Sequence, residues 1–140
     1  MGRGPAIVVI DDDDSVNRLV AHWLTREDYQ VLTASTGMEG MRVLGRTLPD
    51  AVLLDLDLPD ASGVELLTQI KARHGSVPVV MMTADSGIES VVSCMQRGAF
   101  DYVTKPIDRT KLMTTLRNAV DKGRSELRIC LLYTSPSPRD

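Results

Sequence analysis

The stretch Ala51-Val52-Leu53-Leu54-Asp55-Leu56-Asp57-Leu58-Pro59 decides the fold of this chain, because a short apolar run ends on a carboxylate. An unbroken apolar run of this length is typical of a strand buried on both faces, as in a parallel sheet. Three similar runs are followed by the acidic cluster Asp11 to Asp14, by Thr83 and by the pair Lys105-Pro106. Because open α/β sheets keep their sites at the carboxyl edge of the strands, we expect these side chains to meet there.

Strand-like runs alternate with segments of helical period along the chain. We predict strands over residues 6–10, 30–34, 50–54, 78–83 and 100–104. Apolar residues recur at helical spacing after each of these runs, and Asp14 or Ser15 offers an N-cap for the first helix. This strict alternation implies right-handed βαβ units, and therefore an α/β fold with a doubly wound, five-stranded parallel sheet and five helices.

Size and charge narrow the class of protein. With 140 residues and 43% hydrophobic content, the chain suits one domain with a single core. A net charge of −3 gives no sign of a nucleic-acid surface, and no apolar run approaches the roughly 18 residues of a membrane span. The first apolar run is too short and too closely followed by acids for a signal peptide, so we expect a cytoplasmic protein.

The C-terminal residues 130–140 do not follow this pattern. They read Cys-Leu-Leu-Tyr-Thr-Ser-Pro-Ser-Pro-Arg-Asp, with no period and two prolines, and they resemble the in-frame translation of a sequencing adapter. We therefore expect a domain over residues 1–129, with its core in 6–122, and a non-native tail at 130–140. The native sequence would then continue past Ile129.

The acidic residues at the predicted sheet edge suit magnesium. Mg²⁺ prefers hard oxygen ligands about 2.0 to 2.1 Å away and takes few protein carboxylates, which Asp11 or Asp12 together with Asp55 would supply. Like charges about 4 Å apart cost on the order of 1 kcal/mol even in water, so a bound cation, helped by Lys105, would offset their repulsion. The competing interpretation, a solvated turn at a helix start, suits the last two aspartates of the cluster.

A carboxylate held at a strand end beside a cation can act as a nucleophile toward phosphorus, and Asp55 has that place. Thr83 could donate its hydroxyl to a phosphoryl oxygen, and Lys105 could pair with the same oxygens as a point charge. The alternatives are a helix-capping loop for Asp55, an ordinary strand threonine and a solvated loop lysine. Pro106 permits a cis peptide bond after Lys105, a geometry found in about 5–6% of X-Pro bonds.

Taken together, these residues resemble the receiver domain of two-component response regulators, over residues 6 to about 122. The matching motifs are Val9-Ile10-Asp11-Asp12-Asp13, Leu54-Asp55-Leu56-Asp57-Leu58-Pro59, Ser62-Gly63, Met82-Thr83-Ala84 and Lys105-Pro106. The resemblance implies a flavodoxin-like strand order, 2-1-3-4-5. It also implies that Asp55 accepts a phosphoryl group from a phosphohistidine of a sensor histidine kinase or phosphotransfer protein. Such a domain is a phosphoacceptor switch rather than an enzyme, and catalyses only its own phosphorylation and dephosphorylation.

The same resemblance assigns a Mg²⁺ cofactor and its ligands. Asp12 would bind the ion directly and Asp11 through water, while the main-chain carbonyl of Asp57 would complete the protein ligands beside Asp55. Asp57 and Asp85 also fall where family side chains flank the attacking water. Our hypothesis is that these two acids change the lifetime of the acyl phosphate.

The switch and the output surface are also implied by the resemblance. Thr83 and Lys105 would contact the phosphoryl group, and Tyr102 matches the aromatic residue whose ring moves inward when the threonine is drawn to the phosphate. For Tyr102 the alternative is a half-buried strand tyrosine. The output surface would be the fourth helix, fifth strand and fifth helix, about residues 88–122, where a homodimer or another partner would form without membrane or direct nucleic-acid binding.

Two other functions compete with this interpretation. Asp55-Leu56-Asp57 also resembles the nucleophile motif of haloacid-dehalogenase-type phosphatases, but those enzymes carry it on their first strand, whereas here Asp11 and Asp12 come first. A flavodoxin-like binding module would need a glycine- or Ser/Thr-rich phosphate loop after the first strand, where this chain has aspartates. A pseudo-receiver would lack the acids that this chain retains.

Overall fold

The computed structural model describes residues 4–84 and 88–134, and Asp85 of the hypothesised acidic pair lies outside them. The strands are β1 Ala6–Ile10, β2 Gln30–Ala34, β3 Ala51–Asp55, β4 Val79–Thr83 and β5 Asp101–Thr104. The helices are α1 Asp14–Arg26, α2 Gly37–Arg46, α3 Gly63–Arg73, α4 Ile88–Gln96 and α5 Arg109–Thr134. Each predicted strand is present, with its ends within one residue of the prediction.

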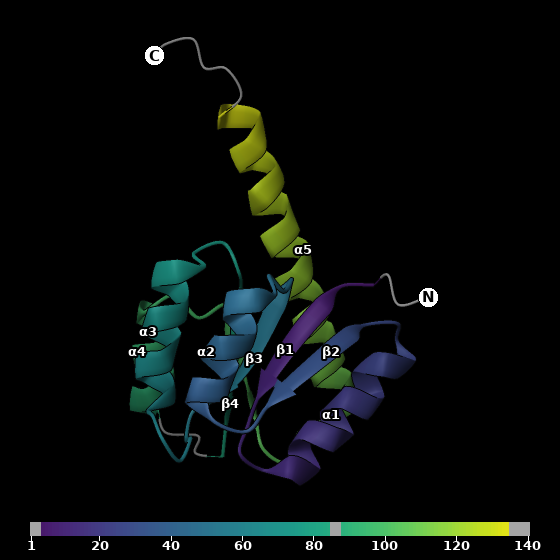
Figure 1. Cartoon of the computed structure of the whole chain (residues 1–140), viewed down its shortest axis with the longest axis vertical. Helices are drawn as coiled ribbons and strands as arrows, with labels where there is room; N and C mark the ends of the chain where they lie inside the picture. The colour runs from purple at the N-terminus through teal and green to yellow at the C-terminus, as the bar shows by residue number, and fades with distance from the viewer. Residues whose placement is uncertain (1–3, 85–87, 135–140) are drawn as a thin grey trace.

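The strands form one parallel sheet in the order β2-β1-β3-β4-β5, which confirms the predicted topology (Figure 1). β3 is the central strand, β1 lies between β2 and β3, and Ile10 of β1 is in register with Ala34 and Leu54. At the other side of β3, Asp55 is in register with Met82, and Thr83 of β4 is in register with Thr104. The carboxyl ends of these strands therefore lie at one edge.

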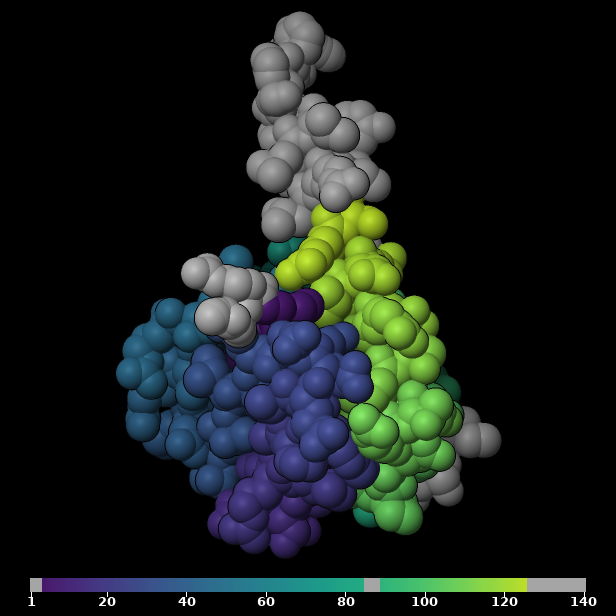
Figure 2. Space-filling view, turned by 90° about the vertical axis from the view of Figure 1, so that its right-hand side faces the viewer, coloured from purple at the N-terminus to yellow at the C-terminus, as the bar shows by residue number. Residues whose placement is uncertain are grey.

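The sheet separates two hydrophobic cores, because successive strand residues face opposite sides. Val8 and Ile10 of β1 belong to the core that also contains residues of α2 and α3. Ile7 and Val9 belong to the core on the opposite face, under α1 and α5. In Figure 2, α1, in dark blue, lies beside α5, in green. The central strands are buried on both sides, as their unbroken apolar sequences predict.

Polar side chains define where three of the helices begin. Thr36 caps α2 and Ser62 caps α3, each by accepting a main-chain N–H of the first turn. The N-cap of α1 is Asp13, which accepts the Ser15 N–H, so the prediction of Asp14 or Ser15 was wrong. The reason is local: the Asp11 carboxylate accepts the Asp13 N–H at 2.9 Å and turns the chain into the helix earlier.

Helix α5 continues past the sheet to Thr134 and stands out from the body of the domain in Figure 1. Residues 130–134 of the predicted tail thus continue the helical backbone, whereas 135–140 lie outside the described residues. The boundary after Ile129 stays a prediction. Over the part of the chain described here, no helix combines the length and the apolarity that a membrane crossing requires.

Candidate phosphoacceptor site

The strand order brings together the chemical groups predicted from the sequence. Asp11 directly follows β1, Asp55 ends β3, Thr83 ends β4 and Lys105 directly follows β5. The Lys105 N–H donates to the Thr83 carbonyl at 2.9 Å, so the segment after β5 stays attached to the end of β4. The peptide bond between Lys105 and Pro106 is cis.

Three carboxylates form an acidic cluster at this edge. Asp11, Asp12 and Asp55 each offer an oxygen, and these oxygens lie within 4.8 Å of one another. Asp11 is fully buried and Asp55 is 4% exposed, while Asp12 faces solvent. The residues present fit Mg²⁺, which takes a few carboxylate oxygens and keeps water or phosphate on its other positions. An open side for such ligands is provided by the exposed Asp12.

Lys105 is the cation of the cluster. Its Nζ lies 2.8 Å from Asp11 Oδ2 and 3.5 Å from Asp55 Oδ2, so one ammonium contacts both buried acids. Burial lowers the pKa of Lys105, but the hydrogen bond and charge of Asp11, followed by those of Asp55, outweigh this effect and leave the pKa raised. Lys105 therefore stays protonated at neutral pH.

The surroundings of Asp55 raise its pKa. Burial and then the charge of Asp11 raise its pKa to about 6, against the opposing effects of the Asp57 N–H and Lys105. The cluster thus carries more negative charge than Lys105 can balance. A divalent cation bound by these carboxylates would balance this excess negative charge.

The loop between β3 and α3, residues 56–62, holds Asp55 and Asp57 in a fixed relation. The Asp57 N–H donates to Asp55 Oδ1 at 3.2 Å, and Asp57 forms an antiparallel bridge with Ser62. The loop closes where the Gly63 N–H donates to the Leu56 carbonyl at 2.8 Å. Gly63 is required here, because a Cβ would lie 2.6 Å from the main-chain oxygens of Asp55 and Leu56. The Asp57 side chain is exposed.

Thr83 and Tyr102 line one small cavity under α4. Thr83 is 2% exposed and Tyr102 is half-buried. The remaining lining is largely apolar and comes from β4, α4 and the β3–α3 loop: Leu56, Met81, Ser90, Val91 and Cys94. Thr83 and Tyr102 therefore border the same cavity.

Asn17 is a residue of the site that the sequence analysis missed. It is buried on α1 and donates from Nδ2 to the main-chain oxygens of Asp11, at 2.8 Å, and Ala34, at 3.3 Å. Asn17 therefore fixes the main chain beside the acidic cluster. A signal was present, because Asn17 occupies the same helical face as Val20 and Leu24, and a polar residue on an apolar face needs a hydrogen-bond partner.

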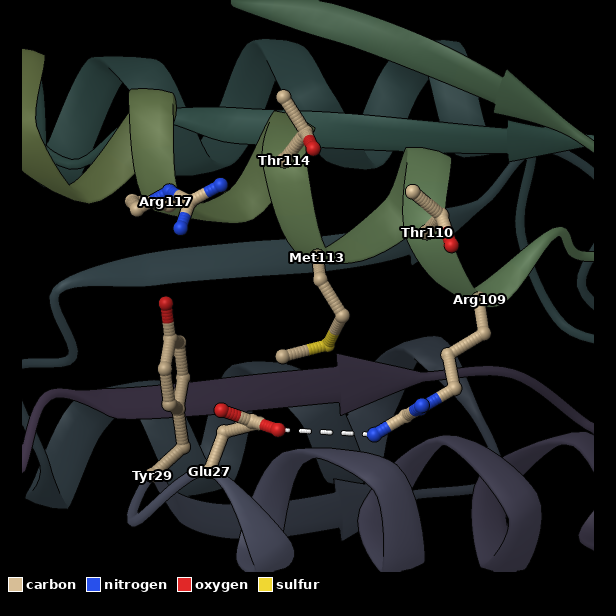
Figure 3. Close-up of a pocket in the computed structure, with 7 residues that line it drawn as sticks. All are labelled: Glu27, Tyr29, Arg109, Thr110, Met113, Thr114 and Arg117. Carbon is tan, nitrogen blue, oxygen red and sulfur yellow. Dashed lines mark hydrogen bonds and ion pairs between the residues drawn. The ribbon is translucent and has the colours of Figure 1, made fainter.

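A larger cavity lies away from this edge, between α1 and α5. It has a volume of about 390 Å³ and is lined by Glu27, Tyr29, Arg109, Thr110, Met113, Thr114 and Arg117. In Figure 3, Arg109 and Glu27 meet across it, with 3.5 Å between Nη2 and Oε2. None of the predicted site residues borders this cavity.

Comparison with known proteins identifies the class. Residues 7–117 match the response regulator receiver domain family, and the chain belongs to that family. The fold is also that of a solved CheY-like receiver domain from Methanospirillum hungatei, with a TM-score of 0.84 at 27% identity over 87% of this chain and 98% of that one. The family match supports neither the phosphatase nor the flavodoxin-like binding module.

Among curated relatives, the chain is 35% identical over 124 residues to the transcriptional regulatory protein GlrR of Escherichia coli, covering 88% of this chain and 28% of the relative. It is 37% identical over 120 residues to the DNA-binding transcriptional regulator NtrC of the same species, covering 86% of this chain and 25% of the relative. The chain thus spans about a quarter of the length of these relatives.

Proposed function

We propose that this receiver domain is a phosphorylation switch in which Asp55 accepts a phosphoryl group from a phosphohistidine of a sensor histidine kinase or phosphotransfer protein. A carboxylate oxygen of Asp55 forms the new O–P bond as the P–N bond to histidine breaks, and the imidazole keeps the nitrogen electron pair. The observation that supports this most directly is the placement of buried Asp55 between two other acids and the Lys105 ammonium.

Each neighbour has a role in the proposed reaction. Asp11, Asp12, Asp55 and the Asp57 carbonyl would hold Mg²⁺, which supplies positive charge to the transferring group. The Lys105 ammonium, now on the acids, would pair with a phosphoryl oxygen. The three carboxylates and the Lys105 ammonium already lie close together, so they would need no large rearrangement.

The conformational response would pass through Thr83 and Tyr102. A Thr83 hydroxyl drawn to the phosphoryl group leaves room in the cavity that both residues line, and the Tyr102 ring moves into it. The change would then reach the surface formed by α4, β5 and α5. We assign the domain to the cytoplasm in this proposal, as a switch that serves an output domain or partner and catalyses only its own phosphorylation and dephosphorylation.

Intact-mass measurement tests the reaction. The full chain is incubated with Mg²⁺ and acetyl phosphate, beside an Asp55→Asn variant. We expect the parent alone to gain one phosphoryl group and to lose it in alkali, as an acyl phosphate does. A folded, Mg²⁺-binding parent that gains no mass would contradict the proposal, and so would an equal gain in the variant.

A further inference from the structure

Asp60, in the β3–α3 loop, is hydrogen-bonded to the start of a helix that precedes it by more than twenty residues. Its Oδ1 accepts the Gly37 N–H at 2.8 Å, and its Oδ2 accepts the Met38 N–H at 3.0 Å. Both hydrogen bonds attach the β3–α3 loop to the N-terminus of α2, and this loop also contains Asp57. Asp60 is exposed and lies outside the acidic cluster.

The contact completes the capping of α2. The first N–H groups of a helix have no partner within it. Here Thr36 satisfies one of them, since its Oγ1 accepts the Glu39 N–H at 3.0 Å. The Gly40 N–H makes the first regular hydrogen bond of the helix, to the Thr36 carbonyl at 2.9 Å. Asp60 accepts two more, those of Gly37 and Met38. These main-chain hydrogen bonds also lower the pKa of Asp60, so the group stays ionised above the acid range.

The helix start and the loop are also packed closely. A Cβ on Gly37 would lie 3.3 Å from Asp60 Oδ1 and 3.4 Å from the Ala61 Cβ. The base of the loop is closed by the hydrogen bond from Gly63 to Leu56. The loop is therefore held at two places: at its base by the Gly63–Leu56 hydrogen bond, and at Asp60 by the hydrogen bonds to α2. Asp57 lies between Leu56 and Asp60 in the sequence.

We propose that Asp60 is a positioning residue, which anchors the β3–α3 loop on α2 and thereby sets the place of the Asp57 main-chain carbonyl as a ligand for Mg²⁺. Asp60 itself touches neither the ion nor the phosphoryl group. This inference rests on the proposed function, because it takes the carbonyl of Asp57 as a metal ligand. Groups that orient metal ligands commonly change metal affinity without contacting the metal.

Titration calorimetry with Mg²⁺ tests this role on the full chain. The variants are Asp60→Ala, Asp60→Asn and the control Thr36→Ala, which removes a cap from the same helix end but leaves the loop attachment intact. We expect Asp60→Ala to raise the Kd for Mg²⁺ about tenfold. Asp60→Asn keeps one acceptor oxygen and should recover part of the affinity. Thr36→Ala should lower the melting temperature while leaving the Kd near that of the parent.

Two results would overturn the inference. One is an unchanged Kd in Asp60→Ala, or in Asp60→Asn if the alanine variant does not fold. The other is an equal loss of affinity in Thr36→Ala, which would assign the effect to helix stability alone. A parent that binds Mg²⁺ but accepts no phosphoryl group would count against the proposed function, and the Mg²⁺ comparison would still decide the role of Asp60.

Discussion

Asp55 and Asp11 are buried side by side, and Lys105 reaches both with a single ammonium group. This arrangement is costly for the metal-free protein, because one cation faces more than one buried anion. The same imbalance makes the site receptive to a divalent cation. At the residue scale, the acids that would bind the metal therefore lower the stability of the folded protein when no metal is bound.

The pH dependence of stability should show this cost. The pKa of Asp55 in the folded protein is about 6, above the ordinary value of 3.8, so the folded state binds more protons than the unfolded state between these two values. The free energy of unfolding therefore includes the full favourable contribution of protonated Asp55 below about pH 4. This contribution is lost as the pH rises through 6 and the carboxyl group ionises in the folded protein. At pH 7.5 in EDTA, we expect Asp55→Asn to be more stable than the parent by about 3 kcal/mol.

Urea unfolding at a series of pH values measures this difference. The gap between variant and parent should close below about pH 4, where Asp55 becomes protonated in the unfolded as well as the folded state. Asp121→Asn, at an exposed carboxylate of α5, serves as the control and should follow the parent. Parallel stability curves for the parent and Asp55→Asn would show that the carboxylate is not destabilised by its surroundings.

At the scale of elements, the site depends on how closely α2 packs against the sheet. A Cβ on Gly40 would lie 2.5 Å from Ile10 Cδ1 and 3.0 Å from its Cγ1, and Ile10 is fully buried at the end of β1. The helix start that Asp60 contacts belongs to this same helix. Close packing of α2 on β1 thus connects the core to the position of the β3–α3 loop.

A pair of glycine substitutions on α2 tests this packing. Gly40→Ala should destabilise the domain by about 1–3 kcal/mol, because the new methyl group overpacks the core at Ile10. Gly45→Ala adds the same group to the same helix with nothing within 4 Å, and should stabilise by about 0.5–1 kcal/mol through helix propensity. Urea unfolding of both variants provides the measurement. Equal effects at the two positions would contradict the close packing.

At the scale of the whole molecule, the site and the proposed output surface lie on neighbouring elements. Tyr102 belongs to β5 and borders the cavity under α4. The outer face of α4 carries Val92 and Met95, which are 44% and 42% exposed. A rearrangement in this cavity would therefore alter an apolar surface directly. We expect this face to bind a second copy of the chain when Asp55 is phosphorylated.

Sedimentation velocity with and without Mg²⁺ and acetyl phosphate measures this association. Phosphorylation should shift the full chain toward a dimer, and Val92→Glu should prevent the shift by placing a charge in the interface. Intact mass must show the same phosphoryl gain in parent and variant. A dimer that forms equally well with Val92→Glu would place the interface elsewhere.

The fold could be predicted from the sequence because its signals are local. Unbroken apolar runs mark the central strands, helical periodicity marks the segments between them, and the handedness of βαβ units limits their order. Asp11, Asp55, Thr83 and Lys105 could be selected for the same reason, since each stands where a strand ends. The family resemblance then supplied the strand order and the roles proposed for these residues.

The remaining features depend on contacts between residues far apart in the chain, and only the tertiary structure decided them. The hydrogen bond of Asn17 to Ala34 and the attachment of Asp60 to α2 are of this kind. The raised pKa of Asp55 is another, because it arises from burial and from Asp11. Sequence by itself determined which groups reach the sheet edge, whereas packing determined their distances, and electrostatic and hydrogen-bond energies depend on distance.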